Sequence, residues 1–132
     1  MTTYLLDANV LIALVVTGHE HHARARAWVR GIDRFAICPI VEGALVRSLV
    51  RLGEHPRVAA DLLSRVHAMA RCEFWSDSLS YKDVSLRHVQ GHSQVTDAYL
   101  AGLARSKGGL LATLDQGLSA TLPDRAVLVP PR

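Results

Sequence analysis

The sequence predicts an α/β fold in which helices cover both faces of a parallel sheet. Short apolar runs of β-type residues alternate along the chain with longer segments whose apolar residues recur at helical spacing. No repeat, low-complexity tract or Gly/Ser-rich linker interrupts this alternation. Because parallel strands need a crossover between them and helices supply it, we expect three layers with the sheet in the middle.

Five of the apolar runs are predicted to be strands. Each is short and rich in aliphatic or aromatic residues, a composition that is typical of buried strands. The predicted strands are residues 4–6, 35–38, 72–75, 110–113 and 127–129.

The segments between these strands carry the apolar stripes of amphipathic helices. The predicted helices are residues 10–16, 21–32, 41–52, 56–69 and 95–103. The first begins near Asn9, and Pro56 opens the fourth at a first-turn position where its missing N–H costs nothing. Lys107 and Gly108 end the last helix with a basic residue and a glycine.

Length and composition predict one domain. The chain has 132 residues, of which 49% are apolar and 20% charged. A chain of this size buries roughly two-thirds of the surface of its unfolded form, so it builds a core without disulfides or a structural metal. We therefore expect a single domain over residues 1–132, and neither a disordered chain nor a disulfide-stapled small fold.

Several features predict a cytoplasmic protein without a membrane segment. The longest apolar run, residues 10–16, is far shorter than the ~20 residues of a membrane-spanning helix. The first residues show neither a basic leader nor a small-residue cleavage site. Cys38 and Cys72 are too few and too far apart for a disulfide framework or a zinc site, so reduced thiols are expected.

The charge balance is modest, but the basic residues are biased in kind. Lys and Arg number 15 against 12 Asp and Glu, a formal net charge of +3, and almost all of the basic residues are Arg. The guanidinium group matches the oxygens of a phosphate, so the bias fits phosphate recognition, although the base composition of the genome explains it equally well.

Four carboxylates stand out because each follows, or lies in the first turn after, a predicted strand or loop at one edge of the sheet. Asp7 follows the first strand, and Glu42 lies in the first turn of the helix after the second. Asp97 lies in the first turn of the helix that leads to the fourth strand, and Asp115 comes just after that strand. The carboxyl ends of parallel strands share one edge, where open α/β folds place their ligand sites.

Each carboxylate alone has a purely structural explanation. Glu42 and Asp97 in first helical turns interact favourably with the helix dipole, at about 0.3–1 kcal/mol each. Asp115 fits a turn, and Asp7 fits a helix cap. Four together would repel one another and destabilise the fold unless a cation neutralises them.

A hard divalent cation, Mg²⁺ or Mn²⁺, is the expected partner of an all-oxygen donor set. No His or Cys lies at zinc-ligand spacing. A carboxylate-held cation of this kind lowers the pKa of a bound water and polarises a phosphoryl oxygen, so the pattern favours phosphate chemistry.

The same residues carry a resemblance to the PIN domain family, and within it to the VapC toxins of bacterial toxin–antitoxin modules. Glu42 and three motifs occur in the order and spacing of the family's acidic positions. The motifs are Leu5-Leu6-Asp7-Ala8-Asn9-Val10-Leu11-Ile12, Gly91-His92-Ser93-Gln94-Val95-Thr96-Asp97-Ala98-Tyr99-Leu100-Ala101 and Leu111-Ala112-Thr113-Leu114-Asp115. The resemblance covers essentially the whole chain.

The resemblance implies a sheet of order 3-2-1-4-5 and a Mg²⁺- or Mn²⁺-dependent endoribonuclease that hydrolyses RNA phosphodiester bonds. It also implies frequent homodimers and hetero-oligomers with a VapB-type antitoxin that inhibits the toxin. The catalytic and metal-binding residues that it implies are Asp7, Glu42, Asp97 and Asp115, with Asn9 and Thr113 lining the pocket. Many relatives carry a basic residue just before the last acid, where this sequence has Leu114.

Other positive residues near these motifs are candidate phosphate contacts. These are Arg47, Arg51, Arg87 and His92. Charge placement alone is weak evidence, because most such residues are ordinary solvated side chains.

Two alternative functions fit parts of the pattern. A phosphatase of the haloacid dehalogenase type would use Asp7 as nucleophile, but that class needs a second Asp two positions later, where Asn9 stands. A non-catalytic binding module of the same fold would use the acidic cluster as a docking site for a basic peptide.

Overall fold

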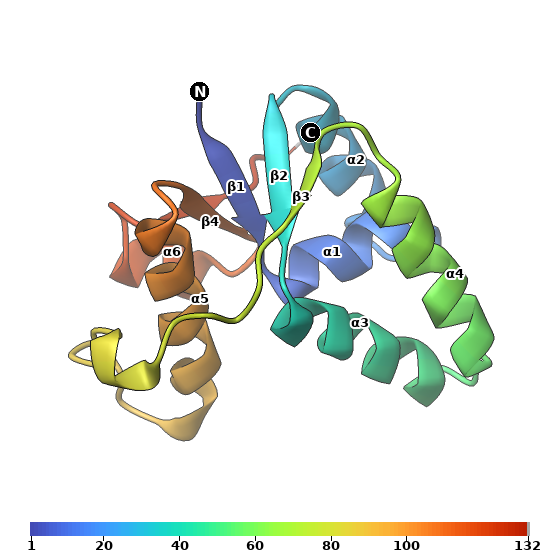
Figure 1. Ribbon diagram of the computed structural model, residues 1–132. Coiled ribbons are helices and arrows are strands. Elements are labelled where there is room, and N and C mark those ends of the chain that lie inside the picture. Colours follow the sequence, from blue (N-terminus) through green and yellow to red (C-terminus); the bar gives the residue numbers. More distant parts are fainter. Residues whose placement is uncertain (132) are drawn as a thin grey trace.

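A five-stranded parallel sheet runs through the middle of the computed structural model, which describes residues 1–131. The strand order is β3-β2-β1-β4-β5 (Figure 1). The strands are β1 (Thr3–Leu6), β2 (Arg34–Ile37), β3 (Cys72–Phe74), β4 (Leu110–Thr113) and β5 (Ala126–Leu128). The predicted α/β class is confirmed, and so is the strand order that the resemblance implied.

The helices divide between the two faces of the sheet (Figure 1). The first group is α1 (Ala8–Val15), α2 (His22–Arg30), α3 (Pro39–Arg51) and α4 (Pro56–His67), and the second is α5 (Val95–Ser106) and α6 (Gln116–Thr121). The chain moves from β1 through β2 to β3 in one direction and then returns across the sheet to β4 and β5. Because such crossovers are right-handed, reversing the direction places the later helices on the opposite face.

The central strands are buried on both sides, as parallel sheets require. Leu5, Leu6, Phe35 and Leu111 are fully buried. Between the sheet and the first group of helices, the rings of Tyr4 on β1 and Trp28 on α2 meet edge to face, with centroids 5.2 Å apart. The apolar core therefore extends on both sides of β1, β2 and β4.

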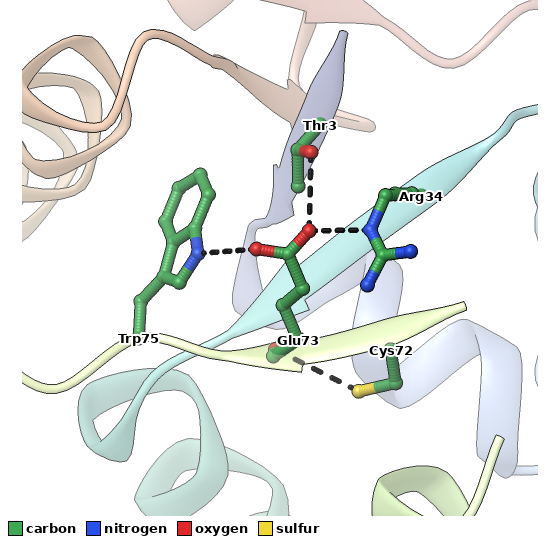
Figure 2. A network of polar contacts seen from close by, with 5 residues as sticks. All are labelled: Thr3, Arg34, Cys72, Glu73 and Trp75. Carbon is green, nitrogen blue, oxygen red and sulfur yellow. Dashed lines mark hydrogen bonds and ion pairs between the residues drawn. The ribbon is translucent and has the colours of Figure 1, made fainter. Parts of the chain in front are cut away.

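A charged network joins the edge strand β3 to its neighbours, in addition to its backbone pairing with β2 (Figure 2). The Glu73 carboxylate accepts hydrogen bonds from Arg34 Nε at 2.5 Å, Trp75 Nε1 at 3.1 Å and Thr3 Oγ1 at 3.4 Å. The bond from Arg34 is the main reason that the pKa of Glu73 lies below its ordinary value. Glu73 thus ties together side chains from the neighbouring strands β1, β2 and β3.

The predicted glycine stop after α5 is confirmed. The helix ends at Ser106, and Gly108 adopts a φ of 73°, a conformation that favours glycine. At Gly109 a Cβ atom would collide with the backbone oxygen of Thr3 and lie 3.1 Å from the Trp75 ring. The glycine pair therefore lets the chain turn and enter β4 close against β1.

Three short elements were not predicted by the sequence pattern. They are α6 and the 3-10 turns η1 (Tyr81–Asp83) and η2 (His92–Gln94). The six residues of α6 bury only Leu118, too little to produce an apolar stripe. No helix within residues 1–131 has the length and apolar character to cross a membrane.

Candidate active site

The site lies where the strand order reverses, between the carboxyl ends of β1 and β4. From these two adjacent strands the chain continues into α1 and α6, which lie on opposite faces of the sheet (Figure 1). In open α/β sheets the crevice at this point holds the ligand. Asp7 follows β1 directly, and Asp115 follows β4 after one intervening residue. The first turn of α5 adds Asp97.

The Thr113 hydroxyl connects the ends of β1 and β4. It donates to Asp7 Oδ2 at 2.8 Å and accepts from the backbone N–H of Asp115 at 3.0 Å and from Asn9 Nδ2 at 3.3 Å. Asn9 Oδ1 in turn accepts from the backbone N–H of Leu114 at 3.1 Å. Asn9 and Thr113 therefore hold the two acidic chain segments in a fixed relation to each other.

Two of the acids also begin helices. Asp7 Oδ1 accepts from the backbone N–H of Ala8 at 2.8 Å and caps α1. Asp115 Oδ1 accepts from the backbone N–H of Leu118 at 3.2 Å and caps α6. These capping bonds match the structural explanations considered for the two residues. Each carboxylate also has a second oxygen outside its cap, which in Asp7 accepts the hydrogen bond from Thr113.

Asp7, Asp97 and Asp115 affect one another electrostatically. Burial raises the pKa of Asp97 to about 6, with further contributions from the charges of Asp7 and Asp115. Burial also raises the pKa of Asp7, and the charge of Asp115 adds to this, although the bonds from Thr113 and Ala8 act in the opposite direction. The structure therefore brings three of the four predicted acids close enough to disfavour one another's charge.

Glu42, the fourth predicted acid, has a different partner. It lies in the first turn of α3, as predicted, and its Oε2 lies 2.6 Å from His67 Nε2 at the end of α4. The His67 ring also packs on Phe74, with ring centroids 5.7 Å apart. Sequence reasoning missed His67 because only the antiparallel packing of α3 and α4 brings it next to Glu42.

A hollow of about 360 Å³ opens beside Asp97 and Asp115. We call it the acidic hollow. Its other polar lining side chains are His88, Ser93, Gln94 and Thr121, none of which was predicted as a site residue. The unpredicted helix α6 forms one wall and the start of α5 another, so the hollow gives solvent and ligands access to two of the three acids.

The donor set fits a hard divalent cation in its chemistry. Carboxylates and a hydroxyl are the ligands that such ions prefer, and a cation would offset the burial and the neighbouring charges that together raise the pKa of Asp97. No group of three or more His, Cys, Asp or Glu side chains within residues 1–131 is arranged as a ready coordination shell.

Comparisons with known proteins agree on one family. The PIN domain family model matches residues 4–121. Ribonuclease VapC29 of Mycobacterium tuberculosis is 55% identical over 129 residues, which are 97% of each chain.

Two solved structures have the same fold. The crystal structure of VapC20 from M. tuberculosis, a Sarcin-Ricin loop cleaving toxin, superposes with a TM-score of 0.67 at 20% identity and covers 89% of this chain and 93% of that one. A toxin–antitoxin complex from Klebsiella pneumoniae reaches a TM-score of 0.61 at 20% identity, with coverages of 94% and 95%.

Proposed function

The chain belongs to the PIN domain family, and we propose that it is a VapC-type endoribonuclease, the toxin of a toxin–antitoxin pair. The observation that carries the proposal is the group of Asp7, Asp97 and Asp115 at the switch point of the sheet. The near full-length similarity to a named ribonuclease supports it. Within this proposal the phosphatase alternative is dropped, because Asn9 bonds the backbone of Leu114 where a second catalytic Asp would be needed.

Asp7, Asp97 and Asp115 would hold the cation, for which Mg²⁺ is the proposed ion and Mn²⁺ a substitute. When bound, a divalent ion would activate a water and stabilise the charge that develops on the phosphoryl oxygens. The raised pKa values of Asp7 and Asp97 support this role, because their carboxylates gain most from a nearby positive charge.

The surrounding residues would position the acids. Thr113 donates to Asp7 Oδ2 and so fixes the orientation of the Asp7 carboxylate. Asn9 fixes the turn after β4 through the Leu114 N–H, which places Asp115 at the start of α6. These bonds order the acids before a ligand binds, so less conformational entropy is lost on binding.

Glu42 would act in the same hydrolysis, either as a ligand of a second ion or as the group that orients the attacking water. Its carboxylate accepts a proton from that water in the latter case. Hydrolysis then proceeds without a covalent enzyme intermediate and leaves a 5′-phosphate and a 3′-hydroxyl on the RNA. The His67 contact orients the Glu42 carboxylate.

The proposed partners are an RNA substrate and a VapB-type antitoxin, and the proposed assemblies are a homodimer and a toxin–antitoxin hetero-oligomer. The fold that the chain shares with a solved toxin–antitoxin complex is consistent with an antitoxin partner. We also propose that residues 1–132 form a single domain built around the one five-stranded sheet.

RNA cleavage by the purified protein tests the function directly. We expect cleavage in Mn²⁺ or Mg²⁺ that EDTA abolishes and that Asp97→Asn reduces at least a hundredfold, while Asp61→Asn, a matched change on exposed α4, leaves it intact. Cleavage that persists unchanged in Asp97→Asn would identify a contaminating nuclease. An inactive wild-type protein that still binds the divalent ion would support the non-catalytic binding module instead.

A further inference from the structure

A second hollow lies beyond the acidic hollow on the same side of α5. It has a volume of about 350 Å³, and Arg105 of α5 and Arg125 before β5 are among its lining residues. We call it the basic hollow. Ala98 lines the acidic hollow, whereas Gly102 and Arg105 line the basic one. Their spacing of four and three residues places all three on one stripe of the helix.

The two hollows also share the walls on either side of this stripe. One wall comes from the segment between β3 and α5, which contributes Ser85 to the basic hollow and His88 to the acidic one. The other wall comes from α6 and the residues after it, which contribute Thr121 to the acidic hollow and Arg125 to the basic one. Ala98 and Arg105 are seven residues apart, a helical rise of about 10 Å.

The guanidinium groups of the basic hollow have no protein partner within residues 1–131. Arg34 is the only arginine there that forms a salt bridge, and Arg24 and Arg71 donate to backbone oxygens. The one acid that lines the basic hollow, Asp83, is already engaged by Lys82 Nζ at 3.2 Å. Arg105 and Arg125 therefore bring to this hollow two guanidinium charges that form no ion pair within residues 1–131, against the single carboxylate of Asp83.

We infer that the basic hollow is a subsite for the backbone phosphates of single-stranded RNA whose scissile bond lies at the acidic hollow. This inference rests on the proposed function and adds the place where the substrate is held. Arginine matches phosphate oxygens in shape and charge. The acidic hollow repels a polyanion, so attraction close by has to come from elsewhere, and Arg105 and Arg125 supply it.

Arg47, Arg51, Arg87 and His92, the phosphate contacts considered from the sequence, line neither hollow. Arg105 and Arg125 stand far apart in sequence, near the end of α5 and just before β5, and only the fold brings them together. A basic hollow also disfavours a basic peptide as occupant, so RNA is the ligand that the charges favour.

RNA binding without cleavage tests the subsite. A fluorescein-labelled single-stranded RNA is titrated in EDTA at several salt concentrations, and the affinity is followed by anisotropy. Each phosphate neutralised on a single strand contributes about 0.7 to the slope of log K against log salt. In Arg105→Gln/Arg125→Gln we expect that slope to become shallower by about 0.7 if the two arginines share one phosphate and by about 1.4 if they bind two.

The control is Arg57→Gln/Arg65→Gln on exposed α4, which removes the same charge on the opposite face of the sheet (Figure 1). We expect this control variant to keep the wild-type slope. We expect Arg105→Lys/Arg125→Lys to recover part of the slope that Arg105→Gln/Arg125→Gln loses. An unchanged slope in the Gln variant of the basic hollow would overturn the subsite. So would an equal loss in the α4 control, because the effect would then reflect net charge alone.

Cleavage separates this inference from the proposed function. In Mn²⁺ the Arg105→Gln/Arg125→Gln variant should show a raised KM and an unchanged kcat, because the arginines hold the RNA away from the reacting atoms. A wild type that binds RNA with the expected slope but never cleaves it would defeat the proposed function and leave the subsite standing. Variants that bind RNA normally but lose an antitoxin would assign the hollow to a protein and overturn the subsite.

Discussion

His67 Nε2 at the end of α4 lies 2.6 Å from Glu42 Oε2 in the first turn of α3. The Glu42 side chain is 18% exposed and the His67 side chain 41% exposed, so the contact stands at the rim of the protein. Phe74 supports the imidazole ring from β3. This contact therefore links α4 to α3 through Glu42, a residue to which we assign a role in hydrolysis.

The first prediction concerns this contact. We expect Glu42→Gln and His67→Phe to be coupled by about 0.5–1 kcal/mol in a double-mutant cycle of urea unfolding, as is usual for a partly exposed pair. His67→Phe keeps a ring against Phe74 but removes the nitrogen. His67→Gln, which restores an N–H donor, should recover RNA cleavage that His67→Phe loses. Additive single variants would show that the contact does not form in solution.

The second prediction concerns the divalent ion. At a concentration of about 100 Kd, Mg²⁺ or Mn²⁺ should stabilise the wild type by about 2.7 kcal/mol, which raises Tm by on the order of 10 °C. Asp7→Asn keeps an acceptor for the Ala8 N–H but removes the charge, so the metal-dependent shift should disappear. Asp61→Asn serves as the control in the same thermal melts. An equal shift in Asp7→Asn would place the ion elsewhere.

The third prediction follows from the raised pKa of Asp97, about 6 against an ordinary value of 3.8. Between these values the folded protein keeps a proton that the unfolded chain has released, so the free energy of unfolding falls as pH rises. Because the side chain is partly exposed, we expect the metal-free wild type to lose about 1 kcal/mol between about pH 4 and pH 6 relative to Asp97→Asn.

Urea unfolding of both proteins in EDTA measures this difference. Comparison with Asp97→Asn cancels the contributions of all other ionisable groups, which the two proteins share. Parallel pH profiles for the two proteins would contradict the raised pKa. Saturating divalent ion should remove the difference in slope.

The fourth prediction contrasts two glycines. Gly109→Ala should destabilise the fold by about 1–3 kcal/mol, because its Cβ would collide with the Thr3 backbone oxygen and press on Trp75. Gly43→Ala, within α3 and with open space around it, should stabilise the fold by about 0.5–1 kcal/mol. Denaturant midpoints of the two variants should therefore move in opposite directions.

Much of the fold could be predicted because its signals are local. The predicted strand 110–113 coincides with β4, and the predicted strand 127–129 is displaced by one residue from β5. The predicted helix 56–69 runs two residues beyond the end of α4 at His67, since helix ends depend on capping rather than on the apolar stripe. The short α6 escaped prediction because a single buried leucine makes no periodic pattern.

The candidate site shows the same limit. Asp7, Asp97 and Asp115 meet because each stands at the carboxyl edge of a parallel sheet, a relation that strand order alone implies. The Thr113 hydroxyl between Asp7 and Asp115 also follows from its place at the end of β4. The pairing of Glu42 with His67 depends on the packing of two helices, which no residue pattern specifies.

The network around Glu73 bears on whether the protein aggregates at high concentration. β3 lies at one end of the sheet and has only three residues, so the backbone groups on its outer side are open to pairing with a strand from another chain. Glu73 and Arg34 place opposite charges on the face of this short edge. The short length of β3 leaves few backbone groups for a second chain to pair with, and the charge of Glu73 on this strand adds to that protection, so strand-by-strand aggregation is disfavoured when many copies are present.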